Sequence, residues 1–322
     1  MRVDSKNIVE HLGEIDLFIC SSGFESRSTK LAMSLDENKI KTSIVFHLDE
    51  TYKVSSENLR RIKDNLKNIL YVQYPKNNSL ETFDLFYKEI KEFTINYNGN
   101  SKPRIVIDVS TFTREVLLIF IKVLSLNLFS NFDLKVIYTP NESYSDSGTE
   151  SWMTKGIREI RSILGYSGLL SPSKKSLLIV LNGFEEERTE HIIQSFEPYK
   201  ILVGKPSKSG SINNSLNSLS CKKFDYIKNR YQNLIEEEFE FSCVSIHDTY
   251  NVIKDIARKY EMYNIIISPL NNKISTLGVA LAALENENIQ ICYASANQYN
   301  IDSNPLVSDY FLLYDINFNI AK

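Results

Sequence analysis

Short apolar runs alternate with longer amphipathic stretches along the whole chain. In the first half, β-rich runs lie at 15–20, 42–47, 69–73, 104–109 and 133–138, and helical patterns at 27–36, 55–68, 79–94 and 113–128. In the second half, the runs lie at 176–181, 199–203, 240–245, 263–268 and 289–293, and the helical patterns at 184–195, 220–236, 248–261 and 274–285. Strands that alternate with helices of this length predict βαβ units and parallel sheets.

The two halves repeat one order of motifs. IDLFICSSGFESRSTKLA and SLLIVLNGFEEERTEHII each join an apolar strand to Gly-Phe-Glu and an arginine, beginning at Gly23 and Gly183. Later, RIVIDVSTFTREVLLIFIKVL matches NIIISPLNNKISTLGVALAAL, with Ser110 and Ser268 at similar offsets, and Tyr138 precedes Tyr293 by 155 positions. The order predicts an internal duplication: an α/β fold of two tandem Rossmann-like parallel-sheet units related by pseudo-two-fold symmetry.

The predicted organisation has three parts. Residues 1–139 form the first Rossmann-like repeat, 140–175 a linker or lid segment, and 176–322 the second repeat. The middle part is rich in Ser, Gly, Asn and Pro but holds Trp152, which we expect to pack across both halves or to lie in a lid. Residues 305–318 suggest one extra edge strand, and 205–220 the clearest loop of the second repeat.

Composition narrows the class of protein. With 322 residues, 43% hydrophobic residues and a net charge of −3, the chain is typical of globular proteins and gives no strong signal for nucleic-acid binding. The N-terminus lacks a signal-peptide core, and the longest apolar run, 116–128, is too short to span a bilayer. We therefore expect a cytoplasmic protein with no membrane partner.

Several common kinds of site are missing from the sequence. The four cysteines include no CxxC pair, and the four histidines show no ligand spacing, so no metal is predicted. We expect His47 and His247 to be structural. No GxGxxG, Walker A or GxSxG motif occurs, and no cofactor is predicted.

Unusual polar segments follow the first and fourth predicted strands of each half. They span 21–28 and 108–115 in the first half, and 182–189 and 268–276 in the second. In the common strand order 3-2-1-4-5, strands one and four are neighbours, and ligands bind at their carboxyl ends, at the topological switch point. The sequence therefore predicts one site in each half.

The candidate residues are hydroxyls, amides and cations suited to a phosphorylated ligand. In the first half they are Ser21, Ser22, Gly23, Arg27, Asp108, Ser110, Thr111, Thr113 and Arg114. In the second half they are Asn182, Gly183, Arg188, Ser268, Asn271, Lys273, Ser275 and Thr276. If the protein is an enzyme, Glu25 or Glu185 is the candidate acid or base.

Each residue also has a structural explanation. Glu25 with Arg27, or Glu185 with Arg188, could form an ordinary ion pair. Ser110 and Ser268 could be helix N-caps, Asp108 a loop anchor and Lys273 a solvated surface residue.

The layout resembles the CRISPR-associated Rossmann fold sensors and the fused-pair, SAVED-like sensor domains of bacterial anti-phage signalling. In those families, ligand-contacting loops follow strands one and four, and a Lys-x-Ser/Thr element opens the helix after strand four. Lys273-Ile274-Ser275 fits that element, and Ser21-Ser22 or Asn182 fits the polar end of strand one. The resemblance implies binding of cyclic oligonucleotides, which some members cleave. The chain shows no nuclease, helix-turn-helix or membrane effector, which favours a separate effector protein.

These observations favour a sensor of a nucleotide or other phosphorylated small molecule, in prokaryotic anti-phage defence. Two alternatives stay open: a hydrolase that cleaves a glycosidic or phosphodiester bond, and a structural adaptor without a ligand. The sequence leaves open the ligand, its turnover, the oligomeric state, the pathway partner and which half is functional.

Overall fold

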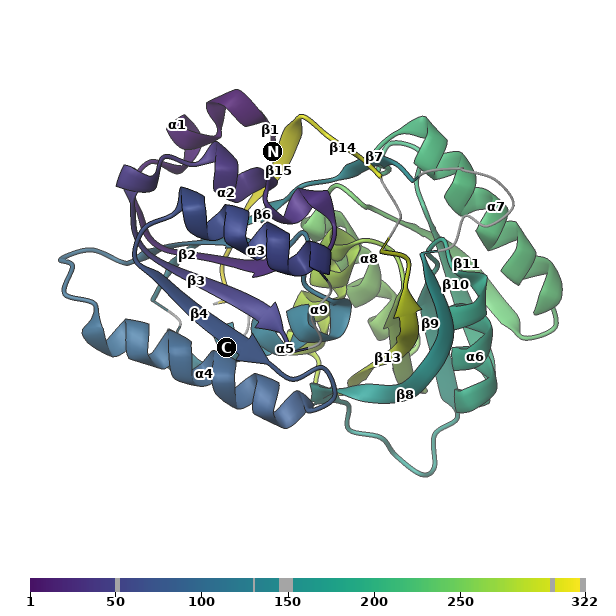
Figure 1. The fold of residues 1–322 in the computed structure, drawn as a ribbon. Helices are drawn as coiled ribbons and strands as arrows, with labels where there is room; N and C mark the ends of the chain where they lie inside the picture. Colours follow the sequence, from purple (N-terminus) through teal and green to yellow (C-terminus); the bar gives the residue numbers. More distant parts are fainter. Residues whose placement is uncertain (50–52, 130, 145–152, 302–304, 319–322) are drawn as a thin grey trace. The chain divides into compact units, whose positions relative to one another are not determined.

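The computed structural model describes residues 1–49, 53–129, 131–144, 153–301 and 305–318. The chain divides into two compact units, Met1–Ser145 with Asn304–Lys322 (unit 1) and Asp146–Ser303 (unit 2). Each unit contains a mostly parallel sheet with helices on both faces (Figure 1). The predicted α/β class with two Rossmann-like units is confirmed. The duplication behind it stays a prediction.

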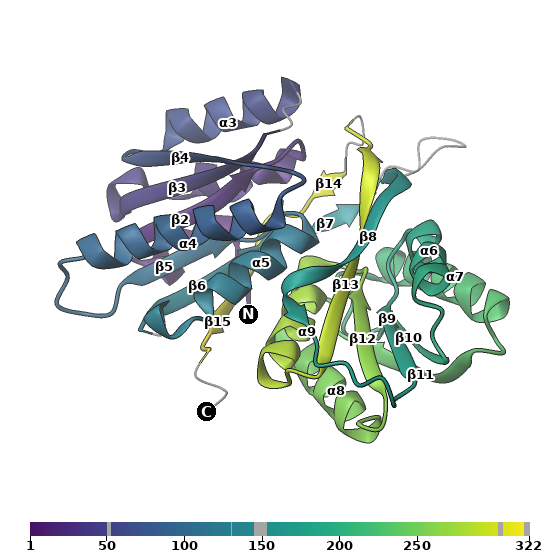
Figure 2. The same cartoon turned by 90° about the horizontal axis from the view of Figure 1, so that it is seen from below.

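Unit 1 contains a seven-stranded sheet in the order β1-β15-β6-β5-β2-β3-β4. Its parallel strands are β2 (Ile15–Ser22), β3 (Ile40–Leu48), β4 (Ile69–Tyr74), β5 (Arg104–Asp108) and β6 (Asp133–Tyr138). The helices are α1 (Ile8–Leu12), α2 (Lys30–Ser34), α3 (Lys53–Asn65), α4 (Ser79–Asn96) and α5 (Arg114–Leu124). Helices α4 and α5 lie on one face of the sheet and α3 on the other (Figure 2). The order 3-2-1-4-5 expected for the five parallel strands is found.

Unit 2 repeats this arrangement. Its six-stranded sheet has the order β11-β10-β9-β12-β13-β8. The parallel strands are β9 (Ser176–Leu181), β10 (Lys200–Pro206), β11 (Ile235–Phe241), β12 (Asn264–Pro269) and β13 (Ile289–Tyr299). Helices α6 (Glu186–Phe196) and α7 (Asn214–Arg230) cover one face, and α8 (Ile246–Lys259) and α9 (Lys273–Glu285) the other (Figure 2).

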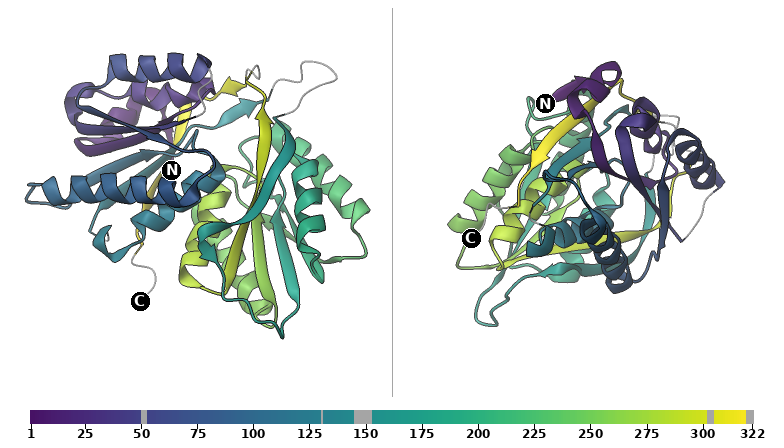
Figure 3. Two further views of the ribbon diagram at one scale, coloured as in Figure 1. Left: turned by 60° about the horizontal axis from the view of Figure 1, so that its bottom comes forward. Right: turned by 90° about the vertical axis from the view of Figure 1, so that its left-hand side faces the viewer.

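The two units exchange one antiparallel strand each. The strand that follows the parallel strands of one unit in the sequence joins the sheet of the other unit. After the fifth parallel strand of unit 1, the chain continues through β7 (Asn141–Ser143) to β8 (Thr154–Ser167), which pairs antiparallel with β13 of unit 2 (Figure 3). After β13, it continues through β14 (Leu306–Val307) to β15 (Tyr310–Ile316), which pairs antiparallel with β6 of unit 1. Each unit therefore completes its sheet with a strand that follows the fifth parallel strand of the other.

This exchange changes the boundaries drawn from the sequence. The segment 140–175 contains β7 and the long strand β8, and β8 pairs antiparallel with β13 along most of its length. The C-terminal strand belongs to unit 1 instead of the second repeat, and it is not an edge strand, since β1 (Arg2–Asp4) pairs with its outer side. Trp152 lies outside the described residues.

The local sequence explains the bounds and the buried faces of helices that cover the sheets. Helix α5 contains most of the longest apolar run and is buried on almost every side. Helix α7 begins at Asn214, inside the segment 205–220 that composition predicted as a loop. The Asn213 side chain caps it, and Leu216, Phe224 and Ile227 place an apolar face on the core. None of the described helices is long and apolar enough to cross a membrane.

Candidate functional site

In both units, the turns after the first and fourth parallel strands contact each other. In unit 1, Thr111 Oγ1, after β5, donates a hydrogen bond of 2.7 Å to the carbonyl oxygen of Ser21 in β2. In unit 2, Asn271 Nδ2, after β12, donates one of 2.7 Å to the carbonyl oxygen of Asn182, after β9. The prediction that the two polar segments of each half lie side by side is therefore confirmed.

The two glycines of the Gly-Phe-Glu turns lie at this contact. A Cβ atom at Gly183 would lie 2.1 Å from the carbonyl oxygen of Leu270, and one at Gly23 would lie 3.0 Å from Thr111 Cβ. A side chain at Gly183 would separate the two turns, so close approach of the backbone explains this glycine. A side chain at Gly23 would meet a side-chain atom at a longer distance, so this position should tolerate alanine better.

Strand register corrects one match made from the sequence. Ile19 pairs with Ile107 in unit 1, and Ile179, at the same distance from its Gly-Phe-Glu turn, pairs with Ile267 in unit 2. Residue 108 therefore corresponds to residue 268, and the match of Ser110 with Ser268 is shifted by two positions. This position of the fourth parallel strand holds a carboxylic acid, Asp108, in unit 1 and a hydroxyl, Ser268, in unit 2.

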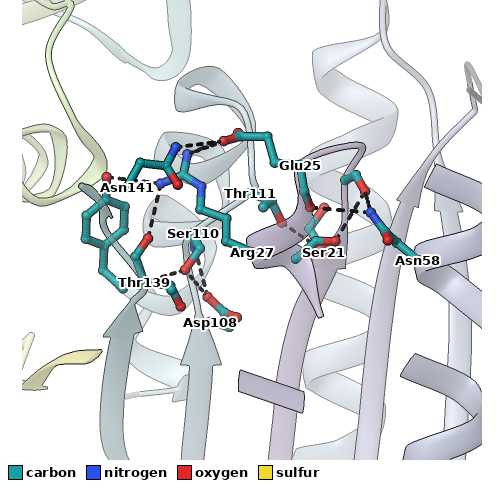
Figure 4. Close-up of polar contacts among 12 residues, drawn as sticks. Ser21, Glu25, Arg27, Asn58, Asp108, Ser110, Thr111, Thr139 and Asn141 are labelled. Atoms are coloured by element: carbon teal, nitrogen blue, oxygen red, sulfur yellow. Dashed lines mark hydrogen bonds and ion pairs between the residues drawn. The ribbon is translucent and has the colours of Figure 1, made fainter. Parts of the chain in front are cut away.

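Arg27 of unit 1 follows the Gly-Phe-Glu turn and is buried. Its guanidinium points toward Glu25 and the end of β6 (Figure 4). Its Nη2 atom forms an ion pair of 2.9 Å with Glu25, whose side chain is 24% exposed. Its Nη1 atom donates to the Tyr138 hydroxyl and to the carbonyl oxygen of Thr139, both at 3.2 Å. Arg27, a predicted phosphate contact, thus holds the Gly-Phe-Glu turn to the end of β6.

Arg188 of unit 2 repeats the arrangement with fewer partners. It is buried, its Nε atom lies 3.3 Å from a carboxylate oxygen of Glu185, and its guanidinium stands 5.6 Å from the ring centre of Tyr293. The other Glu185 oxygen accepts a short hydrogen bond from Thr154 of β8. The matched tyrosines thus accompany the buried arginines in both units.

Asp108 is a buried acid at the end of β5. It accepts hydrogen bonds from the amide and the hydroxyl of Ser110, and the Ser110 hydroxyl in turn accepts from the Thr139 amide at 2.8 Å. Burial raises the pKa of Asp108 to about 6, while the hydrogen bonds from Ser110 and the charge of Arg27 oppose the rise. Asp108 and Ser110 therefore join β5 to β6 through internal contacts.

The hydroxyls predicted for unit 2 also have internal roles. Ser275 and Thr276 are buried, and both donate to the carbonyl oxygen of Asn272. The amide side chain of Asn271 bridges the strand ends, since its oxygen accepts from the Cys243 thiol at 3.1 Å. These residues stabilise the loop after β12.

Arg114 and Lys273 occupy equivalent positions at helix N-termini. Arg114 is the first residue of α5 and Lys273 the first of α9, and both are partly exposed. The preceding residues, Thr113 and Asn272, are the N-caps, and each accepts a hydrogen bond from an amide of the first turn. The capping role considered for Ser110 and Ser268 thus belongs to the residue before each cation.

Several buried side-chain donors in both units have no hydrogen-bond partner within the described part of the chain, and two of them lie beside the candidate site of unit 2. These two are Nδ2 of Asn182 and Nη1 of Arg188, on residues that are 0% and 2% exposed. The Asn182 oxygen is occupied, because it accepts from the Thr189 hydroxyl at 3.0 Å. A buried donor without an acceptor is costly, about 1–3 kcal/mol, so this end of β9 favours a group that brings acceptors.

The structure adds side chains that the sequence analysis did not select. In unit 1, Asn58 of α3 donates to the carbonyl oxygens of Gly23 and Glu25, and Asn141 of β7 donates to the Glu25 carboxylate. His47, expected to be structural, contacts the candidate Ser22: Ser22 Oγ and His47 Nδ1 lie 2.6 Å apart. For the ends of β6 and β13, the sequence provided one indication, the match of Tyr138 with Tyr293.

Among the described residues, no group of three or more His, Cys, Asp or Glu side chains could hold a metal ion.

Comparisons with known proteins give limited information. No family model matches the sequence, and no curated protein is similar to it. A type III CRISPR defence DNA nuclease activated by cyclic oligoadenylate is similar in structure, with a TM-score of 0.49 and 6% identity over 91% of this chain and 67% of that one. A putative universal stress protein from Pseudomonas aeruginosa has a TM-score of 0.25 and 8% identity over 86% of this chain and 92% of that one. At these scores and identities, neither likeness assigns a function.

Proposed function

We propose that this protein senses a phosphorylated small molecule of the nucleotide type, which binds at the switch points of its two units. The observation that carries the proposal is the repeated position of one cation. Arg114 and Lys273 each open the helix that follows the fourth parallel strand. A helix N-terminus combined with a guanidinium or ammonium group is a common way to bind phosphate.

The buried donors of unit 2 add independent support. Asn182 Nδ2 and Arg188 Nη1 lack acceptors, and the oxygens of a phosphate or ribose would supply them. The proposal extends to prokaryotic anti-phage defence through the resemblance found in the sequence, with a separate protein as effector.

The hydrolase alternative that uses Glu25 or Glu185 has less support. Both carboxylates contact a buried guanidinium, and Glu185 also accepts from Thr154. A carboxylate engaged in this way is a poor proton donor. If the protein turns over its ligand, another residue should begin the reaction.

The test is a thermal-shift screen with AMP, ADP, ATP, NAD and cyclic oligoadenylates, followed by calorimetry on the ligands that raise the melting temperature. The cyclic oligoadenylates represent the cyclic oligonucleotides that the sequence resemblance implies. Arg114→Ala and Lys273→Ala should each weaken binding by roughly tenfold to a hundredfold, the value of one charge-assisted hydrogen bond. Their melting temperatures without ligand should stay close to the wild-type value, because both side chains are partly exposed.

Lys122→Ala is the matched control, since Lys122 lies in the last turn of α5, about 12 Å from Arg114 along the helix. It should bind like the wild type. A protein that binds none of the probes, or whose affinity is unaffected by both cation variants, would refute the proposal.

A further inference from the structure

Ser22 and His47 form a pair at the carboxyl ends of two neighbouring strands. Ser22 is the last residue of β2, and it pairs in register with His47 of β3. Their Oγ and Nδ1 atoms are 2.6 Å apart, within hydrogen-bond distance. Because both residues belong to the central sheet, their separation is fixed by the strand pairing and not by a flexible loop.

The protonation state of His47 suits a base. Burial lowers the pKa of His47 from its usual value of 6.5, and the charge of Lys63 lowers it further. The imidazole is therefore neutral at neutral pH, and its Nδ1 atom can accept the hydrogen of the Ser22 hydroxyl. A hydroxyl bonded to a neutral imidazole is the usual form of an activated serine.

Unit 2 builds the same junction without this pair. Ser21 pairs with Phe46 in unit 1, and the equivalent Leu181 pairs with Gly204 in unit 2. The positions of Ser22 and His47 therefore correspond to Asn182 and Lys205 in unit 2. Since the second junction forms with neither a hydroxyl nor an imidazole, the fold itself does not require them.

Ser22 lies where a ligand of unit 1 would bind. It directly precedes the Gly-Phe-Glu turn, and the Ser21 carbonyl next to it contacts the turn after β5 through Thr111. The Ser22 side chain is mostly covered, whereas Gly23 and Glu25 above it are partly exposed. A substrate would reach the hydroxyl from the side of this turn.

We propose that Ser22 is a nucleophile, with His47 as its base, for hydrolysis of a phosphoester at the switch point of unit 1. The substrate class rests on the proposed function. Ser22 Oγ attacks the phosphorus, the Oγ–P bond forms, and the bond from phosphorus to the leaving oxygen breaks. The Ser22 proton passes to His47 Nδ1 and then to the leaving oxygen, which departs as an alcohol.

Water completes the reaction. His47 takes a proton from a water molecule that attacks the seryl phosphoester, the P–Oγ bond breaks, and the proton returns to Ser22. The net reaction converts a phosphoester and water into an alcohol and a phosphate whose new hydroxyl comes from the water. The two units would then differ in role, because the positions equivalent to Ser22 and His47 are Asn182 and Lys205 in unit 2.

A fluorophosphonate probe tests the nucleophile without knowledge of the substrate. The intact protein is incubated with the probe, and the rate of the mass increase and the labelled peptide are measured. We expect labelling of Ser22 in the wild type, none at that position in Ser22→Ala, and a rate roughly a hundredfold lower in His47→Gln, the usual effect of losing a general base. Ser43→Ala, a buried serine of β3 outside the pair, is the control and should be labelled like the wild type.

Melting temperatures show whether the variants fold, and His47→Asn replaces His47→Gln if that variant does not. Wild-type protein that stays unlabelled at Ser22, or labelling at an equal rate without His47, would overturn the proposal. Neither result would affect nucleotide binding, which Arg114→Ala and Lys273→Ala test separately. Binding without labelling would therefore leave the sensor intact and remove the hydrolase.

Discussion

Replacement of Arg27 by methionine should destabilise unit 1 by about 3–5 kcal/mol, the cost of breaking a buried ion pair from one side. The Arg27 side chain is 5% exposed and contacts Glu25, the Tyr138 hydroxyl and the Thr139 carbonyl. Methionine keeps much of the volume but donates nothing. The variant leaves the Glu25 carboxylate without its cation and the Thr139 oxygen without this donor.

The double variant Glu25→Gln with Arg27→Met should recover part of this loss. It removes the stranded charge, and neutral replacements of a buried pair are often tolerated well. We therefore expect the double variant to be more stable than Arg27→Met alone by about 1–2 kcal/mol. The Glu25 side chain is 24% exposed, so water limits the recovery.

Urea unfolding measures the free-energy change, and hydrogen exchange assigns it to a unit, because two units need not unfold together. Peptides from β2 and β6 should lose protection, while peptides from β9 and β12 should not. The control is Lys30→Met, which breaks an exposed ion pair with Asp309 and should lose less than about 1 kcal/mol. If Arg27→Met loses no more than this control, the buried pair does not anchor the turn.

Three further predictions concern the acid, the glycines and the exchanged strand. The pKa of Asp108, raised from 3.8 to about 6 in the folded protein, favours its protonated form, so the wild type should lose stability relative to Asp108→Asn as pH rises from about 4 to about 6. The change is at most about 3 kcal/mol, measured by urea unfolding across this range, and a parallel pH dependence of the two proteins would contradict it. Gly183→Ala should lower the free energy of unfolding by about 1–3 kcal/mol, because its Cβ would lie 2.1 Å from a backbone oxygen. It should also lower the melting temperature more than Gly23→Ala does, and calorimetry that ranks the two in the opposite order would refute this. Deletion of 304–322 removes β15 and exposes β6, so hydrogen exchange should rise in the sheet of unit 1 and stay unchanged in β9–β12; equal increases in both sheets would contradict the strand exchange.

Much of the fold could be predicted from the sequence, because buried parallel strands and their helices have distinct periodicities. The runs around Ile19, Ile107, Ile179 and Ile267 are continuously apolar, which indicated central strands covered on both faces. The order 3-2-1-4-5 is a common one for sheets with right-handed crossovers, and it is the order found. The strand exchange could not be predicted, since no local pattern tells which sheet an antiparallel strand will join.

The position of the site could be predicted from the sequence, whereas the contacts of its side chains could not. The polar segments after strands one and four lie together, as expected, because the carboxyl ends of neighbouring parallel strands meet. Which polar groups bind their own neighbours depends on tertiary contacts: Arg27 contacts Tyr138 and Thr139, more than a hundred residues away. The sequence favours a structural role for His47 because it closes a strand, and its contact with Ser22 follows only from the pairing of β2 and β3 in register.

The most direct test of the proposed binding sites is calorimetry on the double variant Arg114→Ala with Lys273→Ala. The probe is the nucleotide of the screening panel that raises the wild-type melting temperature most. The account predicts that the double variant keeps its melting temperature and loses measurable binding of that probe. Binding of equal affinity in the double variant and the wild type would contradict it.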